Sequence, residues 1–279
     1  MTPDEYAATA AMITSRVARK IHQFALLFAP TEMSWAEWIR MLQFVYPEIE
    51  AGRSDIAKAA RMFYDSQRSE HHPTLPRHDR PTEEYRFEWF VQNMEPARKQ
   101  MSQMDSRENA VANMVLRAVR EVENAGRRQI IHAVQTDPEP QVVKGWARVA
   151  TGRETCAWCL MLVSRGPVYE SARTSGLELD DETAVDLYRA GMDVTEYMNQ
   201  WHTGCDCKVV PVFDLQNWPG KEAADAALKL WIEAGKEADE WIESGKARTN
   251  NVNRETINAL RRRLARGEVN TSQFAAFAA

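Results

Sequence analysis

The sequence predicts a predominantly helical α+β protein, and three observations lead to this fold class. Apolar residues recur at three- and four-residue steps through the first half of the chain and again near its end, as on the buried face of a helix. Two prolines in residues 137–140 interrupt this pattern. All four cysteines and one strong strand pattern, at residues 208–213, lie between the two helical parts. We therefore expect three parts: a helical N-terminal region at 1–137, a small Cys/His-stapled α+β module at 141–219 and a helical C-terminal tail at 220–279.

The N-terminal region should begin with a pair of amphipathic helices. Ser34 is suited to cap the second helix, and Pro47 should end it, because proline removes a backbone donor and clashes with the preceding turn. A third helix is expected to carry Ile56, Ala60 and Phe63. The apolar stripe of the first helix consists of Tyr6, Ala10, Ile13, Val17, Ile21, Phe24 and Phe28.

A proline-rich segment at residues 71–81 should form an extended, exposed loop, since three prolines exclude a continuous helix. Its histidines, His71, His72 and His78, would suit a second metal site, but in such a loop we expect them to be solvated. Helical periodicity returns at residues 85–101 and is strongest at 111–134.

The central module and the tail have their own patterns. A short helix is expected at residues 181–190, with Asp180 as its cap. Residues 273–279 are small and apolar, and we expect them to be disordered unless a partner holds them. Two helical stripes precede them, Ala227, Trp231, Ala234, Ala238 and Trp241 in one, and Ile257, Leu260 and Leu264 in the other.

Composition narrows the class of protein. The chain has 279 residues, of which 44% are hydrophobic and 27% charged, as in a globular protein with a sizeable core. Its net charge of -5 argues against a protein whose whole surface coats nucleic acid. No apolar run in the sequence approaches the roughly 20 residues that a membrane helix needs. The sequence also lacks the basic start and following apolar run that are typical of a secretory signal. We therefore expect synthesis in a cytoplasm, no membrane contact, and reduced thiols.

Two short motifs carry the chemistry of the sequence. Cys156 and Cys159 form a C-x2-C pair, and His202, Cys205 and Cys207 form an H-x2-C-x-C cluster. Thiolates and an imidazole at such spacings suit a tetrahedral zinc ion in a structural site. These five residues are the candidate metal ligands. The preferred set is Cys156, Cys159, His202 and Cys207, with Cys205 replacing one of them or lying beside them.

Three other interpretations of the cysteines remain open. The thiols could be ordinary buried side chains, or a disulfide could join the two clusters after release into an oxidising environment. A redox C-x-x-C of the thioredoxin kind is disfavoured, because the sequence around Cys156 does not indicate a strand followed by a helix start.

These residues also carry a family resemblance. Residues 152–159, 164–169 and 202–213 resemble the core of the MuF-like minor head proteins of tailed bacteriophages, in particular those of actinobacteriophages. The resemblance is specific over about residues 140–215, architectural for the N-terminal region and weak for the tail. The family's Cys/His residues correspond to the five candidate ligands above. Between the last two cysteines the family often has a basic residue, whereas this chain has Asp206.

The resemblance implies a low-copy minor capsid protein that associates with the portal vertex, takes part in head assembly and influences DNA packaging or ejection. Its partners would be portal and capsid or scaffold proteins. We expect no enzyme activity: the chain would be made in the host bacterial cytoplasm and incorporated into the virion head. The N-terminal helices would dock on the portal or pack with copies of themselves.

The alternative is a capsid maturation protease acting on scaffold and capsid proteins. The sequence has no G-x-S-x-G elbow and no H-E-x-x-H helix, and Ser164 with His132 would be an arbitrary pair. A third possibility is contact with packaged DNA. Two basic patches would serve it, Arg261, Arg262, Arg263 and Arg266 in one, and Arg117, Arg120, Arg127 and Arg128 in the other, although neighbouring carboxylates favour a solvated face.

Overall fold

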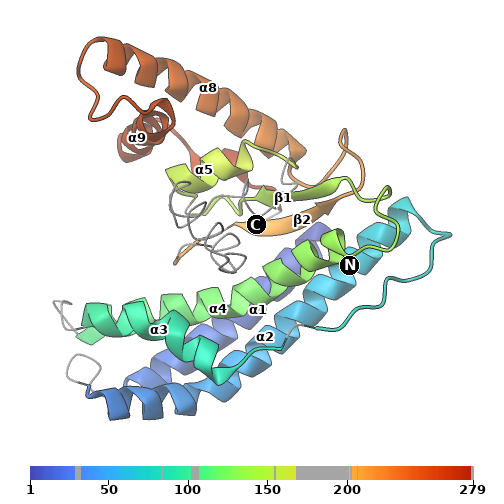
Figure 1. The fold of residues 1–279 in the computed structure, drawn as a ribbon, viewed down its shortest axis with the longest axis vertical. Coiled ribbons are helices and arrows are strands. Elements are labelled where there is room, and N and C mark those ends of the chain that lie inside the picture. Colours follow the sequence, from blue (N-terminus) through green and yellow to red (C-terminus); the bar gives the residue numbers. More distant parts are fainter. Residues whose placement is uncertain are drawn as a thin grey trace, which may run out of the picture. The chain divides into compact units, whose positions relative to one another are not determined.

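The described part of the chain is predominantly helical with one small antiparallel sheet, which confirms the predicted α+β class (Figure 1). The computed structural model describes residues 1–28, 33–82, 84–101, 107–153, 155–167, 201, 203–205 and 207–277. The chain divides into two compact units, Met1–Ala133 with Trp201–Gly204, and Val134–Gln200 with Cys205–Ala279. The three-part division at residues 137, 141 and 219 stays a prediction.

Helix α1 (Pro3–Ala25) begins at a capping box, in which Thr2 accepts from the backbone of Glu5 and the Glu5 carboxylate accepts from the backbone of Thr2. The predicted stripe is buried from Tyr6 to Ile21. The helix ends before Phe28, so the last member of that stripe packs against the core from outside the helix.

Helix α2 (Trp35–His71) begins at the predicted cap, Ser34, but continues through Pro47, so the prediction that Pro47 ends it is wrong. Both Pro47 and Gln43, whose carbonyl loses its helical partner, lie on the exposed side of the helix, where water can replace that bond. Val45 and Ile49 are buried on either side of the proline. Burial of such side chains, at about 1.5–3 kcal/mol each, outweighs the roughly 3 kcal/mol cost of a helical proline. The residues assigned to a third helix, Ile56, Ala60 and Phe63, therefore belong to α2.

Helices α3 (Phe87–Met101) and α4 (Arg107–Gln135) complete the helical unit, as the periodicity predicts. Their apolar residues join those of α1 and α2 in one continuous core. Close approach of the helices depends on Gly52, because a Cβ there would lie 2.8 Å from Val17 Cγ2 and 3.3 Å from Val122. Glycine thus lets α2 pack directly against α1 and α4.

The segment between α2 and α3 is a loop, as predicted, but it is not exposed throughout. Arg80 is buried, lies over the Tyr64 ring and pairs with Asp65 of α2. Arg77 also pairs with Asp65, at 2.7 Å. The guanidinium of Arg68 donates to the carbonyl of Pro76. These charged contacts fasten the loop along α2, which the proline count alone does not reveal.

The three histidines of the predicted loop differ in position and exposure, and His71 is the last residue of α2. His71 is exposed and His72 half-buried, whereas His78 is buried, so the expectation of a solvated side chain is wrong for His78. His78 is buried because its loop is held along α2, and its backbone carbonyl accepts a hydrogen bond from the side chain of Arg80.

The second unit is built around strands β1 (Gly145–Val149) and β2 (Lys208–Val212), which pair antiparallel with Ala147 opposite Val210. Strand β2 confirms the predicted strand. A short helix, α5 (Ala157–Val163), follows β1. The helix expected at residues 181–190 lies outside the described residues.

Helices α8 (Lys221–Glu243) and α9 (Val252–Ala265) pack against each other and against α5. They are followed by a 3₁₀ turn, η3 (Thr271–Phe274). Among the residues that the structure describes, no helix is both long and apolar enough to cross a membrane.

The C-terminal segment corrects the prediction of disorder for residues 273–279. Phe274 and Phe277 are buried, and Ala275 forms a β-bridge with Ala150. The hydroxyl of Thr271 donates to the carbonyl of Gly152 at 3.0 Å. Two buried aromatic rings and this backbone pairing hold the segment against the sheet, while residues 278–279 lie outside the described range.

Candidate metal centre

Cys156 and Cys159 are positioned by the start of α5. Cys156 is the N-cap of the helix, and its sulfur accepts from the backbone NH of Cys159 at 3.4 Å. This arrangement places both thiols on the same end of the helix, with Cys156 half-buried and Cys159 buried. The C-x2-C spacing therefore produces a local pair, as predicted.

The antiparallel sheet brings the second cysteine pair to the first. Val149, at the end of β1, lies opposite Lys208, at the start of β2. Because α5 follows β1 and Cys207 directly precedes β2, this register closes the two motifs on each other. The sulfur atoms of Cys159, Cys205 and Cys207 all lie within 4.8 Å of one another, and all three residues are buried.

The spacing of the thiols fits a shared ion better than a disulfide. The sulfur atoms of Cys159 and Cys205 are 3.4 Å apart, and none of the four cysteines, all of which the structure describes, forms a disulfide. A disulfide requires about 2.05 Å. Thiolates that share a tetrahedral zinc at about 2.3 Å stand about 3.8 Å apart, so only a small adjustment separates this group from a zinc-binding geometry.

The electrostatics of the thiol group point the same way. Hydrogen bonding to Cys156, then to Cys205 and Cys207, together with burial, raises the pKa of the Cys159 thiol above its ordinary value. Several buried thiolates this close together would repel one another without a cation. A bound metal supplies that charge and holds the thiolates deprotonated. The buried three-cysteine group could therefore hold a metal ion.

The structure brings some of the five candidate metal ligands together and does not describe all of them. Cys159, Cys205 and Cys207 form the group, and Cys156 adjoins it through its bond to Cys159. His202 lies outside the described residues, as does Asp206. The preferred set of Cys156, Cys159, His202 and Cys207 remains a prediction. Cys205, treated as a replacement or neighbour in that prediction, is a full member of the described group.

The prediction that no strand and helix start surround the C-x-x-C pair is wrong. Strand β1 does precede α5, and Cys156 does cap that helix, so the local order is a strand followed by a helix start. Strand β1 could not be predicted from the sequence, because it is buried along most of its length and shows no alternation of polar and apolar residues. Two further thiols beside Cys159 nevertheless distinguish this group from an isolated redox pair.

Ser164, considered as a nucleophile, caps the C-terminus of α5. It is buried, and its hydroxyl donates to the carbonyl of Met161 at 2.7 Å. His132 is half-buried on α4 in the other compact unit. The environment of Ser164 is that of a helix-capping serine.

The arginines of both basic patches are largely engaged by carboxylates or buried. In the C-terminal patch, Arg262 and Arg263 pair with Glu237 at 3.0 and 2.9 Å, and Arg266 pairs with Glu268. Arg261 is exposed and donates to Asn258.

On α4 the expectation of a solvated basic face is wrong for two arginines. Arg120 is buried and pairs with Glu121, and Arg127 is buried and pairs with Glu123. Arg127 also lies over the ring of Trp201, 4.5 Å from its centroid. Trp201, which directly precedes the H-x2-C-x-C cluster, is thus anchored within the helical unit, a role that sequence reasoning missed. A tryptophan adjacent to a ligand motif was the available signal.

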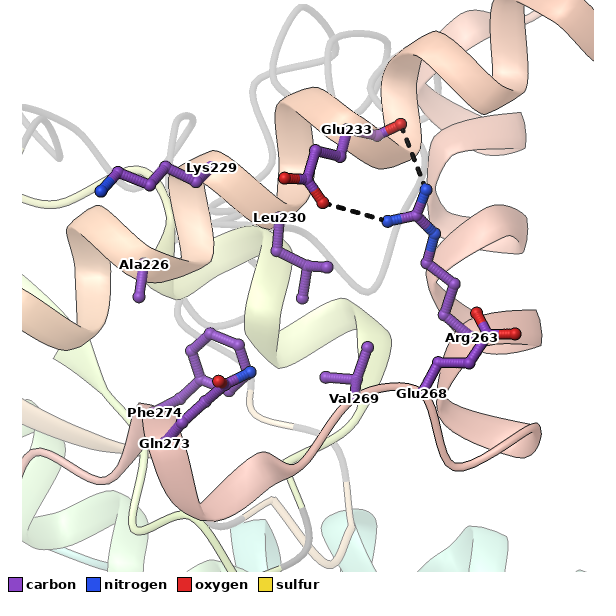
Figure 2. A pocket seen from close by; sticks show the side chains of 9 residues that line it. All are labelled: Ala226, Lys229, Leu230, Glu233, Arg263, Glu268, Val269, Gln273 and Phe274. Carbon is purple, nitrogen blue, oxygen red and sulfur yellow. Dashed lines mark hydrogen bonds and ion pairs between the residues drawn. The ribbon is translucent and has the colours of Figure 1, made fainter.

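A pocket of ≈ 310 Å³ lies between α8, the end of α9 and the segment leading into η3 (Figure 2). Leu230, Val269 and Phe274 form its apolar part. At its rim the carboxylate of Glu233 pairs with Arg263 at 3.4 Å. The lining is mixed, because Lys229 and Glu268 join Glu233 and Arg263 beside these apolar side chains.

Comparison with known proteins gives clear relatives. A family model described as VG15 protein matches residues 2–234. The Gene 15 protein of Mycobacterium phage L5 is 56% identical over an alignment 291 residues long. The alignment covers 99% of this chain and 99% of that protein. The Gene 15 protein of Mycobacterium phage D29 is 58% identical over 272 residues, which cover 95% of this chain and 99% of that protein. No solved structure matches the chain.

Proposed function

This chain belongs to the VG15 protein family and is a bacteriophage protein, and on that premise we propose that it is a minor structural protein of the phage head. In this proposal it is made in the host cytoplasm, associates with the portal vertex and is incorporated into the virion. Its role is to support head assembly, with an influence on DNA packaging or ejection.

The observation that carries this proposal is the buried thiol group. Cys159, Cys205 and Cys207 come from two of the three segments in which the chain resembles MuF-like minor head proteins, and their sulfur atoms lie within 4.8 Å of one another. A phage origin, established by the relatives, is what such a protein requires. The portal as partner rests on the resemblance and is the part that experiment must decide.

We assign a structural zinc ion to this group. Cys159, Cys205 and Cys207 would supply three thiolates, and Cys156 or His202 the fourth ligand. When bound, zinc would cross-link the start of α5 to the start of β2 and neutralise the buried thiolates. Four protein ligands leave no open position for a hydrolytic water, so the site would serve stability and not catalysis.

Metal analysis of the purified chain tests this assignment. We expect about one zinc per chain, as in structural sites with four protein ligands. Cys159→Ala should abolish it, because it removes the thiol at the centre of the group. Ser164→Ala, on the same helix, is the matched control and should retain zinc. Metal-free wild-type protein, prepared without chelators and with all thiols reactive, would contradict the zinc site.

Virion composition tests the role in the head. Phage lacking this gene and complemented with a tagged chain should yield purified heads that contain the chain at low copy and cross-linked to the portal. Cys159→Ala should reduce its incorporation. A chain that is needed for infection but absent from purified heads would overturn the structural role while leaving the zinc assignment intact.

The alternative, a capsid maturation protease, makes a different prediction. Ser164 donates its hydroxyl to a backbone carbonyl within its own helix, which supports a structural serine. We therefore expect Ser164→Ala and His132→Ala to leave the masses of capsid and scaffold proteins unchanged in assembled heads. Unprocessed capsid protein in either variant would favour the protease.

Contact of the C-terminal arginine patch with packaged DNA would require exchange of existing ion pairs. Arg262 and Arg263 share Glu237, so phosphate would have to displace that carboxylate. We expect the purified chain to bind duplex DNA weakly. Tight binding with a steep dependence on salt concentration, lost on substitution of Arg261 and Arg266, would assign DNA as a direct partner.

A further inference from the structure

One face of the hairpin formed by α1 and α2 carries two pairs of exposed apolar side chains. At one end, just after α1, Leu27 is 73% exposed, and Phe44 of α2 is 54% exposed. Phe44 meets Phe24 of α1 edge to face, with ring centroids 4.9 Å apart. Farther along the hairpin, Met12 near the middle of α1 is 67% exposed and Met62 of α2 is 56% exposed. Singly exposed apolar side chains are common on protein surfaces, so what matters here is how these four are arranged along the hairpin.

Helical geometry places these residues on one continuous surface. Phe44 and Met62 are eighteen residues apart in α2. With 3.6 residues per turn, that spacing is about five full turns, so both side chains lie on the same face about 27 Å from each other. On α1, Met12 and Arg16 stand about 40° apart around the helix axis by the same measure, and Leu27 lies in the turn just after the helix. The two helices lie side by side (Figure 1).

The middle of this surface is charged and contains ion pairs between α1 and α2. Arg16 of α1 lies 2.8 Å from Asp55 and 3.6 Å from Glu48 of α2, and Lys20 lies 2.6 Å from Glu48. The paired cations are on α1 and the paired anions on α2, and exposed Arg19 of α1 and Lys58 of α2 lie beside them. Arg16, Lys20 and Asp55 keep 40%, 48% and 41% of their side chains exposed, so they can also meet a second molecule.

This distribution is complementary to itself. A two-fold axis parallel to the helices would place α1 of one copy against α2 of another. Arg16 and Lys20 of one copy would then face Glu48 and Asp55 of the other, twice, and each apolar pair would meet the same pair of the second copy. A surface for nucleic acid would instead carry charge of one sign.

We propose that this face of the α1–α2 hairpin binds a second copy of the chain about a two-fold axis parallel to the helices. The face belongs entirely to the helical unit, and the inference does not depend on the metal centre or on the role in the phage head. Its extent is about 27 Å by about 20 Å, since packed helices lie 8–10 Å apart and each is about 10 Å wide. About 1,000 Å² would therefore be buried in total, near the lower limit for a specific interface, so the dimer should be weak.

Sedimentation equilibrium of the full-length chain tests the proposal. We expect a monomer–dimer equilibrium with a dissociation constant of about 1–100 μM. Leu27→Lys should weaken association at least about tenfold, because it places a charge at an apolar contact made twice. Leu116→Lys, at a 48% exposed position on α4 outside the hairpin, is the control and should not change it. A chain that stays monomeric at about 200 μM, or a Leu27→Lys variant that dimerises like wild type, overturns the proposal.

Charge reversal separates an intermolecular contact from an effect on the fold. Arg16→Glu alone and Asp55→Arg alone should each weaken self-association, because each sets like charges opposite each other across the two-fold axis. An equimolar mixture of the two variants should form a heterodimer, since the carboxylate introduced in one chain then faces the guanidinium introduced in the other. Failure of the mixture to associate more tightly than either variant alone would rule out this arrangement.

Discussion

A close helix contact in the helical unit depends on the absence of a side chain at Gly52. A Cβ at this position would lie 2.8 Å from Val17 Cγ2, within a core that has no room to relax. We expect Gly52→Ala to lower the free energy of unfolding by about 1–3 kcal/mol through overpacking. Chemical denaturation monitored by circular dichroism measures this change.

Gly235, in the interior of α8, is the matched control. A Cβ there would meet only Thr256 Oγ1 at 3.9 Å, an ordinary contact. Gly235→Ala should therefore stabilise the protein by about 0.5–1 kcal/mol, since alanine restricts the unfolded chain and suits a helix better. Equal effects of the two substitutions would show that helix propensity, and not the tight packing at Gly52, controls both positions.

The Cys159 thiol should give the protein opposite pH dependences with and without metal. Its folded pKa is raised by hydrogen bonds to Cys156 and the other two thiols and by burial. In the metal-free chain, the stabilising contribution of the protonated thiol is thus present below the unfolded pKa of about 8.5 and is lost as pH rises above it. In the zinc-bound chain, stability should instead fall with acid, because protons displace the metal.

Urea midpoints between about pH 5 and pH 10, with and without a chelator, measure both slopes. Cys159→Ala should flatten the alkaline decline in the chelated sample. If chelated and untreated protein have the same pH profile, the thiol group does not bind metal in the folded state.

At the level of single residues, spacing predicted the thiol group better than it predicted burial of charge. Two Cys pairs with short spacing indicate a shared site whatever fold connects them, and the structure brings three of the thiols together. Burial of Arg80 and Arg127 depends on partners from other segments, Asp65 and Glu123 for their charges and aromatic rings for their guanidinium groups. Such partners cannot be identified from an arginine's own sequence neighbours.

Among the elements, the C-terminal segment makes the clearest prediction. Phe274 is 1% exposed, and the segment around it is held to β1's neighbour Ala150 by a β-bridge. Phe274→Ala should lower the free energy of unfolding of this unit by about 3–5 kcal/mol and release the segment. Limited proteolysis, which should cleave the variant near its C-terminus, provides the measurement. Gln273→Ala, at an exposed neighbouring position, should leave the segment protected.

The long helices were predictable and the short strand was not. Over α1, α2 and α4, apolar periodicity extends through many turns and predicts helix, although the prediction wrongly divided α2 at Pro47. Strand β1 has only five residues, with buried neighbours on both faces, and therefore lacks the alternation by which a half-exposed strand is identified. Its existence follows from pairing with β2, which is a contact between segments distant in the sequence.

For the molecule as a whole, the two compact units differ in what stabilises them. The helical unit has a continuous core drawn from α1, α2, α3 and α4. The other unit combines a two-stranded sheet with α5, α8 and α9, and it contains all of Cys156, Cys159, Cys205 and Cys207. A two-stranded sheet is marginal on its own, so this unit has more to gain from a metal cross-link.

Removal of metal should therefore destabilise one unit selectively. With zinc removed by a chelator, hydrogen exchange measured by mass spectrometry should become at least about tenfold faster in α5, β1 and β2. Exchange in α1 and α2 should stay unchanged, because their protection depends on apolar packing within the helical unit. Adding zinc back to the chelated protein should restore protection, whereas magnesium should not, since thiolates select zinc over magnesium. Equal acceleration in both units would mean that they unfold as a single cooperative body, and no acceleration in either would mean that the thiol group contributes to the fold only as buried side chains.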